Sequence, residues 1–393
     1  MEHNKLIFSK VPTLRFAEYI DEWHKYALSD FATRITRRNK NNESSLPLTI
    51  SAQYGLVDQI TFFNKTVASV DLSGYYLLYN GDFAYNKSYS NDYAWGAVKR
   101  LDKYEKGCLS SLYFVFHPTD KVDSDYLTHY FETSKWHKGI SDIAGEGARN
   151  HGLLNMAVDD YFATKHYLPS LSEQKKIACF LNLRTKRIEI QNKIISKYET
   201  LIKGIRHRVF GSICGEKQSS LGGFLEEYSE KNVANDLQSV AVGKYGIRKR
   251  EEIYSKELSA DYSKNKVIRK NTLIIGMGST QIDIGILTTD DCYCVSPAYT
   301  TYRIKGINSF YLQEYLIELN PLLSVRYMIT SARQGKAVNK EDLMKHLMTI
   351  HSESEQKEIC QCFENLYSRL QIEKEMLSAL QKQKAFLLQS MFI

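Results

Sequence analysis

Residues 170–210 read SLSEQKKIACFLNLRTKRIEIQNKIISKYETLIKGIRHRVF, and residues 352–392 read SESEQKEICQCFENLYSRLQIEKEMLSALQKQKAFLLQSMF. The second segment is a diverged copy of the first. The SEQK words, the isoleucine that follows them and the final phenylalanine all align at one offset, because 355 − 173, 359 − 177 and 392 − 210 each equal 182. A repeat at a fixed offset is a strong organising signal in a sequence. It predicts that the 393-residue chain is an internal duplication.

Each copy has the pattern of a long coiled-coil helix. Ser170 with Glu173, and Ser352 with Glu355, fit the S-x-x-E capping box, which satisfies backbone donors in a first helical turn. Positions with alternating four- and three-residue spacing form a narrow apolar seam flanked by charged side chains, which favours a two-helix coiled coil. Neither copy contains proline, and each predicts one long helix with a rise of about 1.5 Å per residue. The predicted seam includes Ile177, Leu181, Ile188, Gln191, Ile195, Ile359, Phe363, Leu370, Glu373 and Leu377.

Two polar residues interrupt this seam near the helix midpoints. Gln191 and Glu373 align at the same offset of 182, so antiparallel pairing with pseudo-two-fold symmetry would place them opposite one another. A polar pair at a seam position usually sacrifices some stability and fixes the register of the two helices. The alternative is that both side chains reach out to water at a loosened seam.

The segments before the two helices carry fainter traces of the duplication. Residues 28–31 (LSDF) match 221–224 (LGGF), and residues 54–56 (YGL) match 245–247 (YGI), with offsets that fall from 193 and 191 towards 182. Clusters of β-branched and aromatic residues between turn signals predict strands, at 75–78, 112–116, 272–275 and 298–304. The predicted fold class is α+β, with two similar, mixed β-rich domains at 1–168 and 214–350, and two long antiparallel helices at 169–213 and 351–393.

Composition limits the class of partner. Lys plus Arg total 52 against 45 for Asp plus Glu, a net charge of +7, which favours a polyanionic partner. The 27 tyrosines suit a polar, wet interface, although ordinary surface and core tyrosines explain them equally well. The seven cysteines include no CxxC or His pair, so we expect reduced thiols and not a metal site. Since no signal peptide or apolar run of about 18 residues is found, we expect a cytoplasmic protein without membrane contact.

The order domain, SEQK-type helix, domain, SEQK-type helix resembles the specificity (S) subunits of type I restriction-modification enzymes across essentially the whole chain. Further similarity lies in residues 82–90 with 99–101, in 243–250, and in 11–16 before Trp23. The resemblance implies two target-recognition domains, each reading one half of a split double-stranded DNA site. It also implies that the helices form a spacer and a platform for two methyltransferase subunits, which carry the restriction subunits. The chain itself would bind no cofactor, whereas its partners would use S-adenosylmethionine, ATP and Mg.

Basic clusters and polar loops supply the candidate DNA-binding residues. Lys and Arg neutralise phosphates and set the register on DNA, while polar loop side chains can reach base edges. For each group, a solvated charge run or an ordinary hairpin turn is the alternative. The candidates in the first domain are Arg34, Arg37, Arg38, Lys40, Lys87, Ser88, Tyr89, Ser90, Asn91, Lys99, Arg100 and Arg149. Those in the second domain are Lys244, Tyr245, Arg248, Lys249, Arg250, Ser279, Thr280, Gln281 and Arg333.

Motifs of an independent enzyme are missing from the sequence. Residues 320–323 (NPLL) lack the second proline and the aromatic residue that mark DNA amino-methyltransferases, and residues 276–278 (GMG) form a lone GxG. There is no G-x-x-x-x-G-K-[ST] phosphate cradle, and the histidines show no metal-ligand spacing. We therefore expect a non-catalytic subunit. A coiled-coil adaptor that reads no DNA sequence, or an enzyme with an unrecognised site, remains the alternative.

Overall fold

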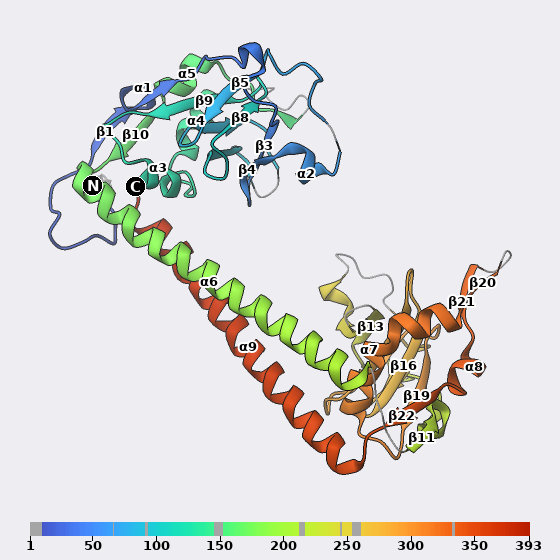
Figure 1. Ribbon diagram of the computed structural model, residues 1–393. Helices are drawn as coiled ribbons and strands as arrows, with labels where there is room; N and C mark the ends of the chain where they lie inside the picture. The colour runs from blue at the N-terminus through green and yellow to red at the C-terminus, as the bar shows by residue number, and fades with distance from the viewer. Residues whose placement is uncertain are drawn as a thin grey trace. The chain divides into compact units, whose positions relative to one another are not determined.

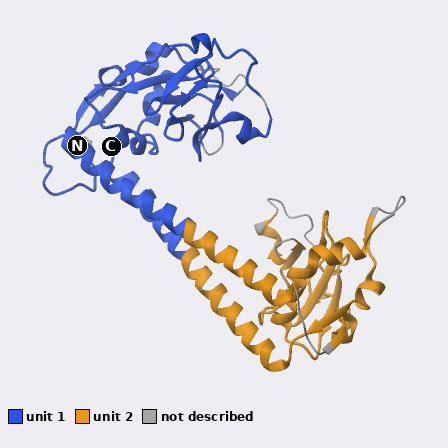
Figure 2. Cartoon of the chain, in the orientation of Figure 1, with its two compact units in different colours: residues 1–192, 375–393 blue, residues 193–374 orange. Residues whose placement is uncertain are grey.

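The computed structural model describes residues 10–65, 67–90, 93–144, 152–211, 217–243, 246–253, 261–331 and 335–393. The chain forms two compact units, residues 1–192 with 375–393, and residues 193–374 (Figure 2). Each unit contains one β-rich domain and a part of each of two long helices (Figure 1). Within the described ranges, no helix has both the length and the apolar character needed to span a membrane.

The two long helices are α6 (Leu171–Phe210) and α9 (Glu353–Ser390). In the first unit, Arg184 near the start of α6 donates to Gln383 near the end of α9 over 3.2 Å. In the second unit, Lys374 of α9 pairs with Glu199, in the second half of α6, at 3.1 Å. The start of one helix therefore packs on the end of the other, and the pairing is antiparallel.

The first domain is built around an antiparallel sheet in the order β2-β9-β6-β7. Two further antiparallel pairs, β3 with β4 and β5 with β8, are joined by an isolated parallel bridge between Pro47 and Cys108. The strands are β1 (His24–Ala27), β2 (Ala32–Arg34), β3 (Leu48–Ser51), β4 (Gly55–Asp58), β5 (Tyr76–Tyr79), β6 (Phe83–Asn86), β7 (Ala97–Arg100), β8 (Lys106–Leu109), β9 (Phe114–Pro118) and β10 (Lys165–Leu168). The short helices are α1 (Leu28–Phe31), η1 (Lys40–Asn42), α2 (Gln59–Phe63), α3 (Ser124–Tyr130), α4 (His137–Ile143) and α5 (Val158–Ala163).

The second domain contains two four-stranded sheets, β12-β19-β16-β17 and β14-β13-β18-β15, and the pairs β11·β22 and β20·β21. Its strands are β11 (Lys217–Ser220), β12 (Leu225–Tyr228), β13 (Ser239–Gly243), β14 (Gly246–Lys249), β15 (Lys266–Ile268), β16 (Thr272–Met277), β17 (Ile282–Leu287), β18 (Tyr293–Val295), β19 (Thr300–Ile304), β20 (Met328–Ser331), β21 (Gly335–Val338) and β22 (Leu347–Ile350). Its short helices are η3 (Leu221–Phe224), η4 (Arg250–Glu252), α7 (Ser309–Tyr327) and α8 (Lys340–Met344). The four strands predicted from sequence correspond to β5, β9, β16 and β19.

The duplication extends to strand order. The sheet β2-β9-β6-β7 of the first domain repeats as β12-β19-β16-β17 in the second, with every pairing antiparallel in both. The parallel pairing of β13 with β18 repeats the Pro47–Cys108 bridge. A buried asparagine also recurs, since Asn39 donates its side-chain amide to the carbonyl of Leu72 and Asn232 donates to that of Tyr262. The two domains are therefore copies of one topology.

The end of each long helix completes the core of one domain. Phe392, which follows α9, lies 5.2 Å from Tyr126 between ring centroids, and Phe210 at the end of α6 lies 5.4 Å from Tyr311. Both phenylalanines are buried. Because truncating a buried Phe to Ala costs about 3–5 kcal/mol, these contacts couple the folding of each domain to that of the helices.

The two helix starts differ in one respect. Ser352 and Glu355 form the expected reciprocal capping box, with Ser352 N donating to Glu355 Oε2 over 2.8 Å and Glu355 N donating to Ser352 Oγ over 3.4 Å. In the first copy only half of the box forms, because the carboxylate of Glu173 accepts two hydrogen bonds from Arg15 at 2.7 and 2.8 Å. A bidentate charge-assisted pair is stronger than a cap to a neutral backbone amide, and this explains the difference.

Candidate nucleic-acid interface

A groove with a volume of about 1030 Å³ lies within the second unit. Its walls come from β14, β17, α7 and the parts of α6 and α9 that belong to this unit. Arg248 and Lys249 on β14 and Gln281 directly before β17 all line it. The structure thus brings together residues from two of the groups that the sequence singled out.

The turn between β16 and β17 projects small polar side chains. Ser279 and Thr280 are exposed, while Gln281 is half-buried. The turn is tight, because a Cβ atom on Gly278 would collide with the carbonyl oxygen of Gln281, and one on Gly276 would collide with the ring of Tyr299. The lone GxG word therefore serves close packing within a hairpin, where only glycine fits.

The basic cluster of the first domain divides into two kinds of residue. Arg37 pairs with the buried carboxylate of Asp82 and also donates from Nε to the carbonyl of Leu77 over 2.8 Å. Arg38 donates to the carbonyl of Gly74 over 2.8 Å and lies above the ring of Tyr76. These two guanidinium groups stabilise the fold of the first domain. Arg34 and Lys40 are exposed, and Arg34 lies 4.0 Å from the carboxylate of Asp159.

The loop after β6 is anchored at its base. Ser88 forms an isolated antiparallel bridge with Leu153, and Tyr89 N donates to the carbonyl of Gly152 over 3.1 Å. The ammonium of Lys87 lies 4.6 Å from the centroid of the Phe114 ring, and burial lowers the pKa of this lysine. Ser90 is exposed. This loop therefore presents polar groups from a fixed base.

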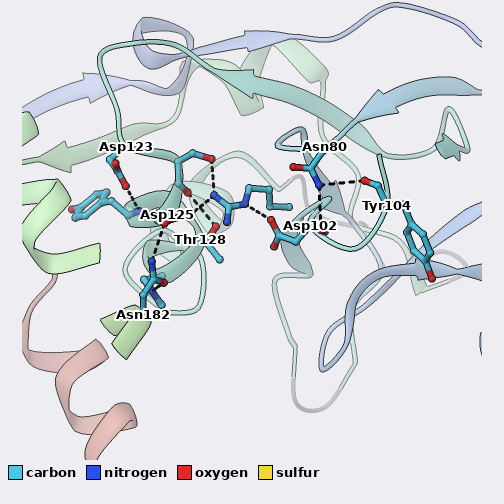
Figure 3. A network of polar contacts seen from close by, with 11 residues as sticks. Asn80, Asp102, Tyr104, Asp123, Asp125, Thr128 and Asn182 are labelled. Atoms are coloured by element: carbon cyan, nitrogen blue, oxygen red, sulfur yellow. Dashed lines mark hydrogen bonds and ion pairs between the residues drawn. The ribbon is translucent and has the colours of Figure 1, made fainter. Parts of the chain in front are cut away.

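Lys99 and Arg100, the last two residues of β7, lie among acidic and polar groups. Arg100 contacts Asp102 at 2.6 Å and Asp125 at 2.7 Å (Figure 3), so two carboxylates balance its charge. Burial lowers the pKa of the neighbouring Lys99, with Glu132 opposing that effect and Lys384 adding to it. Neither residue has the environment of a simple surface cation.

Five candidates, Asn91, Arg149, Lys244, Tyr245 and Arg333, lie outside the described residues. Among the residues that are described, no group of His, Cys, Asp and Glu is arranged to hold a metal ion. Asn320 lies inside α7, where its side chain donates to the carbonyl of Ile282 over 2.9 Å. The Asn-Pro word is thus part of a helix that packs on β17.

All ten predicted seam residues are at least half-buried. Ile188, Ile359 and Leu377 are half-buried, and the other seven are buried. Gln191 and Glu373 are only 5% and 4% exposed. Glu373 pairs with Arg369 one turn earlier at 2.7 Å. The polar seam positions therefore lie inside the helix pairing and not at its water-facing edge.

Sequence reasoning missed a buried polar cluster at the end of α6. Glu314 of α7 is 1% exposed, and Arg206 of α6 contacts it at 2.8 Å through both Nε and Nη2. The hydroxyl of Tyr367 in α9 accepts from Arg206 over 2.7 Å and donates to Glu314 over 3.0 Å. A signal existed, because Glu314 stands between the apolar pairs 311–312 (YL) and 315–316 (YL).

Comparisons with known proteins identify solved structures that share this architecture. No protein-family model matches the chain, and a search of the curated proteins gives no match. The S subunit of the type I restriction-modification system from M. genitalium matches with a TM-score of 0.54 at 15% identity, covering 98% of this chain and 99% of that one. The chain has the fold of a type I S subunit. A chain from a structure of type I R-M complex assembly and conformational transition also matches, with a TM-score of 0.56, 17% identity and coverage of 93% and 96%.

The HsdS subunit from Thermoanaerobacter tengcongensis matches over 94% of this chain and 96% of its own at 16% identity, with a TM-score of 0.46. At these identities the likeness concerns the fold. It confirms the predicted α+β class, in which two similar domains are separated by two long helices.

Proposed function

We propose that this chain is the specificity subunit of a type I restriction-modification system, and that it reads a bipartite, asymmetric double-stranded DNA site. The observation that carries this proposal is one domain topology used twice with different loop side chains. After β16 the second domain presents Ser279, Thr280 and Gln281, whereas after β6 the first presents residues 87–90 (KSYS). Two copies of one scaffold with different polar loops suit the reading of two different half-sites in the major groove.

Exposed apolar residues on the long helices support a docking role. Leu183, Ile190 and Leu201 of α6 are 62%, 48% and 48% exposed. Their spacings of 7 and 11 residues place them on one helix face, and exposed apolar stripes of this kind mark protein interaction sites. Ile372, Met376 and Phe386 are similarly exposed on α9. The helices thus offer a platform for two methyltransferase subunits, and restriction subunits join through these.

Chemistry belongs to the partners under this proposal. The methyltransferase subunits bind S-adenosylmethionine, and the restriction subunits use ATP and Mg, in the cytoplasm. This chain contributes DNA reading and assembly. It should neither methylate nor cut DNA alone, and both activities should appear when the partner subunits are added.

Exchange of residues 1–168 for the equivalent domain of a relative tests the proposal. The hybrid, produced with its partner subunits, should methylate a site in which one half-site has changed and the other is intact, as read by methylome sequencing. A change in both halves would contradict the two-reader arrangement. A complex that binds no DNA at any salt concentration would instead favour a coiled-coil adaptor.

A further inference from the structure

Helix α7 is hydrogen-bonded to β17, the strand that directly follows the Ser279–Gln281 loop of the second domain. The carbonyl of Ile282, the first residue of β17, accepts from the side-chain amide of Asn320 over 2.9 Å, and Ile282 N donates to Ser324 Oγ over 2.9 Å. Ser324 Oγ in turn donates to Asn320 Oδ1 over 3.0 Å. Both backbone polar groups of the residue next to Gln281 are therefore fixed by one helix.

The same helix is fixed to α6 and α9. Glu314, six residues before Asn320, accepts the buried hydrogen bonds from Arg206 of α6 and Tyr367 of α9. Glu314 and Asn320 lie within two turns of one helix, in which Pro321 cannot donate a backbone hydrogen bond to Ile317. The position of the Ser279–Gln281 loop is thus set with reference to the long helices, through side chains that α7 carries.

Helix α3 links the sheet of the first domain to the long helices at the other end of the hairpin, because Arg100 pairs with Phe83 whereas the loop of residues 87–90 follows Asn86. Arg100, at the end of β7, donates to Ser124 Oγ over 2.8 Å and pairs with Asp125 of α3 at 2.7 Å. The other carboxylate oxygen of Asp125 accepts from Asn182 of α6 over 2.8 Å (Figure 3). Burial opposes ionisation of Asp125, yet Arg100 and Asn182 outweigh it and lower its pKa.

A second link joins this region to α9. Glu132, just after α3, pairs with Lys384 at 2.9 Å. Helix α3 therefore resembles α7 in one respect. Each connects the last strand of its domain's antiparallel four-stranded sheet, β7 or β17, to both long helices. The two domains achieve this with different residues, since a surface-facing Arg-Asp-Asn chain replaces a buried Arg-Glu-Tyr cluster.

We infer that α3 and α7 are positioning helices, and that Asn182 and Ser324 determine base discrimination in the first and second half-site, respectively, without contacting DNA. The inference rests on the proposed DNA-reading function. Its physical basis is that a base-edge hydrogen bond is lost when its donor moves by a fraction of an ångström. It also changes the role expected of Arg100 from a phosphate contact to a positioning residue.

Base discrimination can be measured one half-site at a time. The full chain, assembled with its methyltransferase subunits, is titrated by competition against a panel of duplexes with single-base changes in each half-site. Asn182→Ala should reduce discrimination about fivefold to tenfold in the first half-site only, and Ser324→Ala should do so in the second only. Asn192→Ala is the matched control on α6, because within the described ranges that side chain bonds only to the carbonyl of Ile188 in its own helix.

Arg100→Lys separates positioning from phosphate binding. A lysine keeps the charge but cannot bond Asp125 and Asp102 with the same fork. Positioning predicts lost discrimination with an unchanged salt slope, and a double variant with Asn182→Ala no worse than either single variant. A phosphate contact predicts unchanged discrimination. The exchange Asp125→Asn with Asn182→Asp retains one donor and one acceptor between the two positions. This double variant should therefore lose less base discrimination than Asn182→Ala does.

Several outcomes would overturn the inference. Unaltered base preference in Asn182→Ala and Ser324→Ala would do so, as would a uniform loss of affinity for every duplex, because simple destabilisation lowers the active fraction and leaves preference unchanged. Ser324→Thr, which keeps the hydroxyl, should retain preference. If the wild-type complex itself shows no base preference, the proposed function fails, and not this inference alone.

Discussion

Removal of the Glu314 carboxylate tests how firmly the second domain is joined to the long helices. Glu314→Ala would leave the guanidinium of Arg206 buried, without the partner that it contacts at 2.8 Å. It would also leave the hydroxyl of Tyr367 without its acceptor at 3.0 Å. Burial lowers the pKa of Arg206, but Glu314 and Tyr367 reverse that effect and raise it overall. A guanidinium stays protonated in proteins even without an anionic partner, so the variant would hold an uncompensated charge that is largely buried.

The expected cost follows from this geometry. Breaking a buried ion pair by removing one partner costs about 3–5 kcal/mol, because an uncompensated charge remains. For a unit of this size, about 2–4 °C of melting temperature is lost per kcal/mol, so we expect a fall of about 6–20 °C. Replacement of all three polar groups, by Arg206→Met, Glu314→Leu and Tyr367→Phe together, should recover most of the loss, since buried pairs and apolar residues of similar size are often equivalent.

Urea and thermal unfolding followed by circular dichroism, with the two units analysed as separate transitions, provide the measurement. The matched control is Glu318→Ala, one turn further along α7. Glu318 pairs with the exposed His207 at 2.8 Å, and pairs of this kind contribute about 0–1 kcal/mol. The reasoning is refuted if Glu314→Ala costs no more than Glu318→Ala, or if the triple variant is as unstable as the single one.

Three further predictions concern DNA, the seam and acid stability. Substitution of glutamine for the basic residues 248–250 should weaken binding to all sequences and flatten its salt dependence by up to about 0.9 log unit per lost phosphate contact; an unchanged slope in filter-binding titrations would place the cluster away from DNA. Gln191→Leu with Glu373→Leu should leave the chain equally or more stable but less strict about half-site spacing, and an identical sharp optimum on a ladder of spacers would remove the register role. Burial raises the pKa of Glu132, but His129 and Lys384 outweigh it and lower the pKa from 4.5 to about 2. The stability that ionised Glu132 contributes is thus present above pH 4.5 and lost as the pH falls towards about 2. Glu132→Gln should lose less stability over this interval than the wild type, and equal slopes in acid titration would contradict the pairing.

The sequence by itself determined the duplication, the two long helices and their seam. Helical periodicity is a local property, and an apolar residue every three or four positions specifies which face is buried wherever the partner helix lies. Seam residues such as Leu181 and Phe363 are accordingly buried. The positions of four strands, β5, β9, β16 and β19, followed for the same reason, because alternation and turn residues act over a few neighbours.

Only the tertiary structure decided what each charged side chain does. Arg37, Arg100 and Lys40 read alike in the sequence, yet Arg37 meets the buried Asp82, Arg100 meets Asp125, and Lys40 is exposed. Asp82 lies 45 residues from Arg37, and Asp125 lies 25 residues from Arg100, and local spacing does not encode those pairings. The same reason hid Glu314 and Arg206, which are 108 residues apart and meet only because α7 packs between strand β17 and the end of α6.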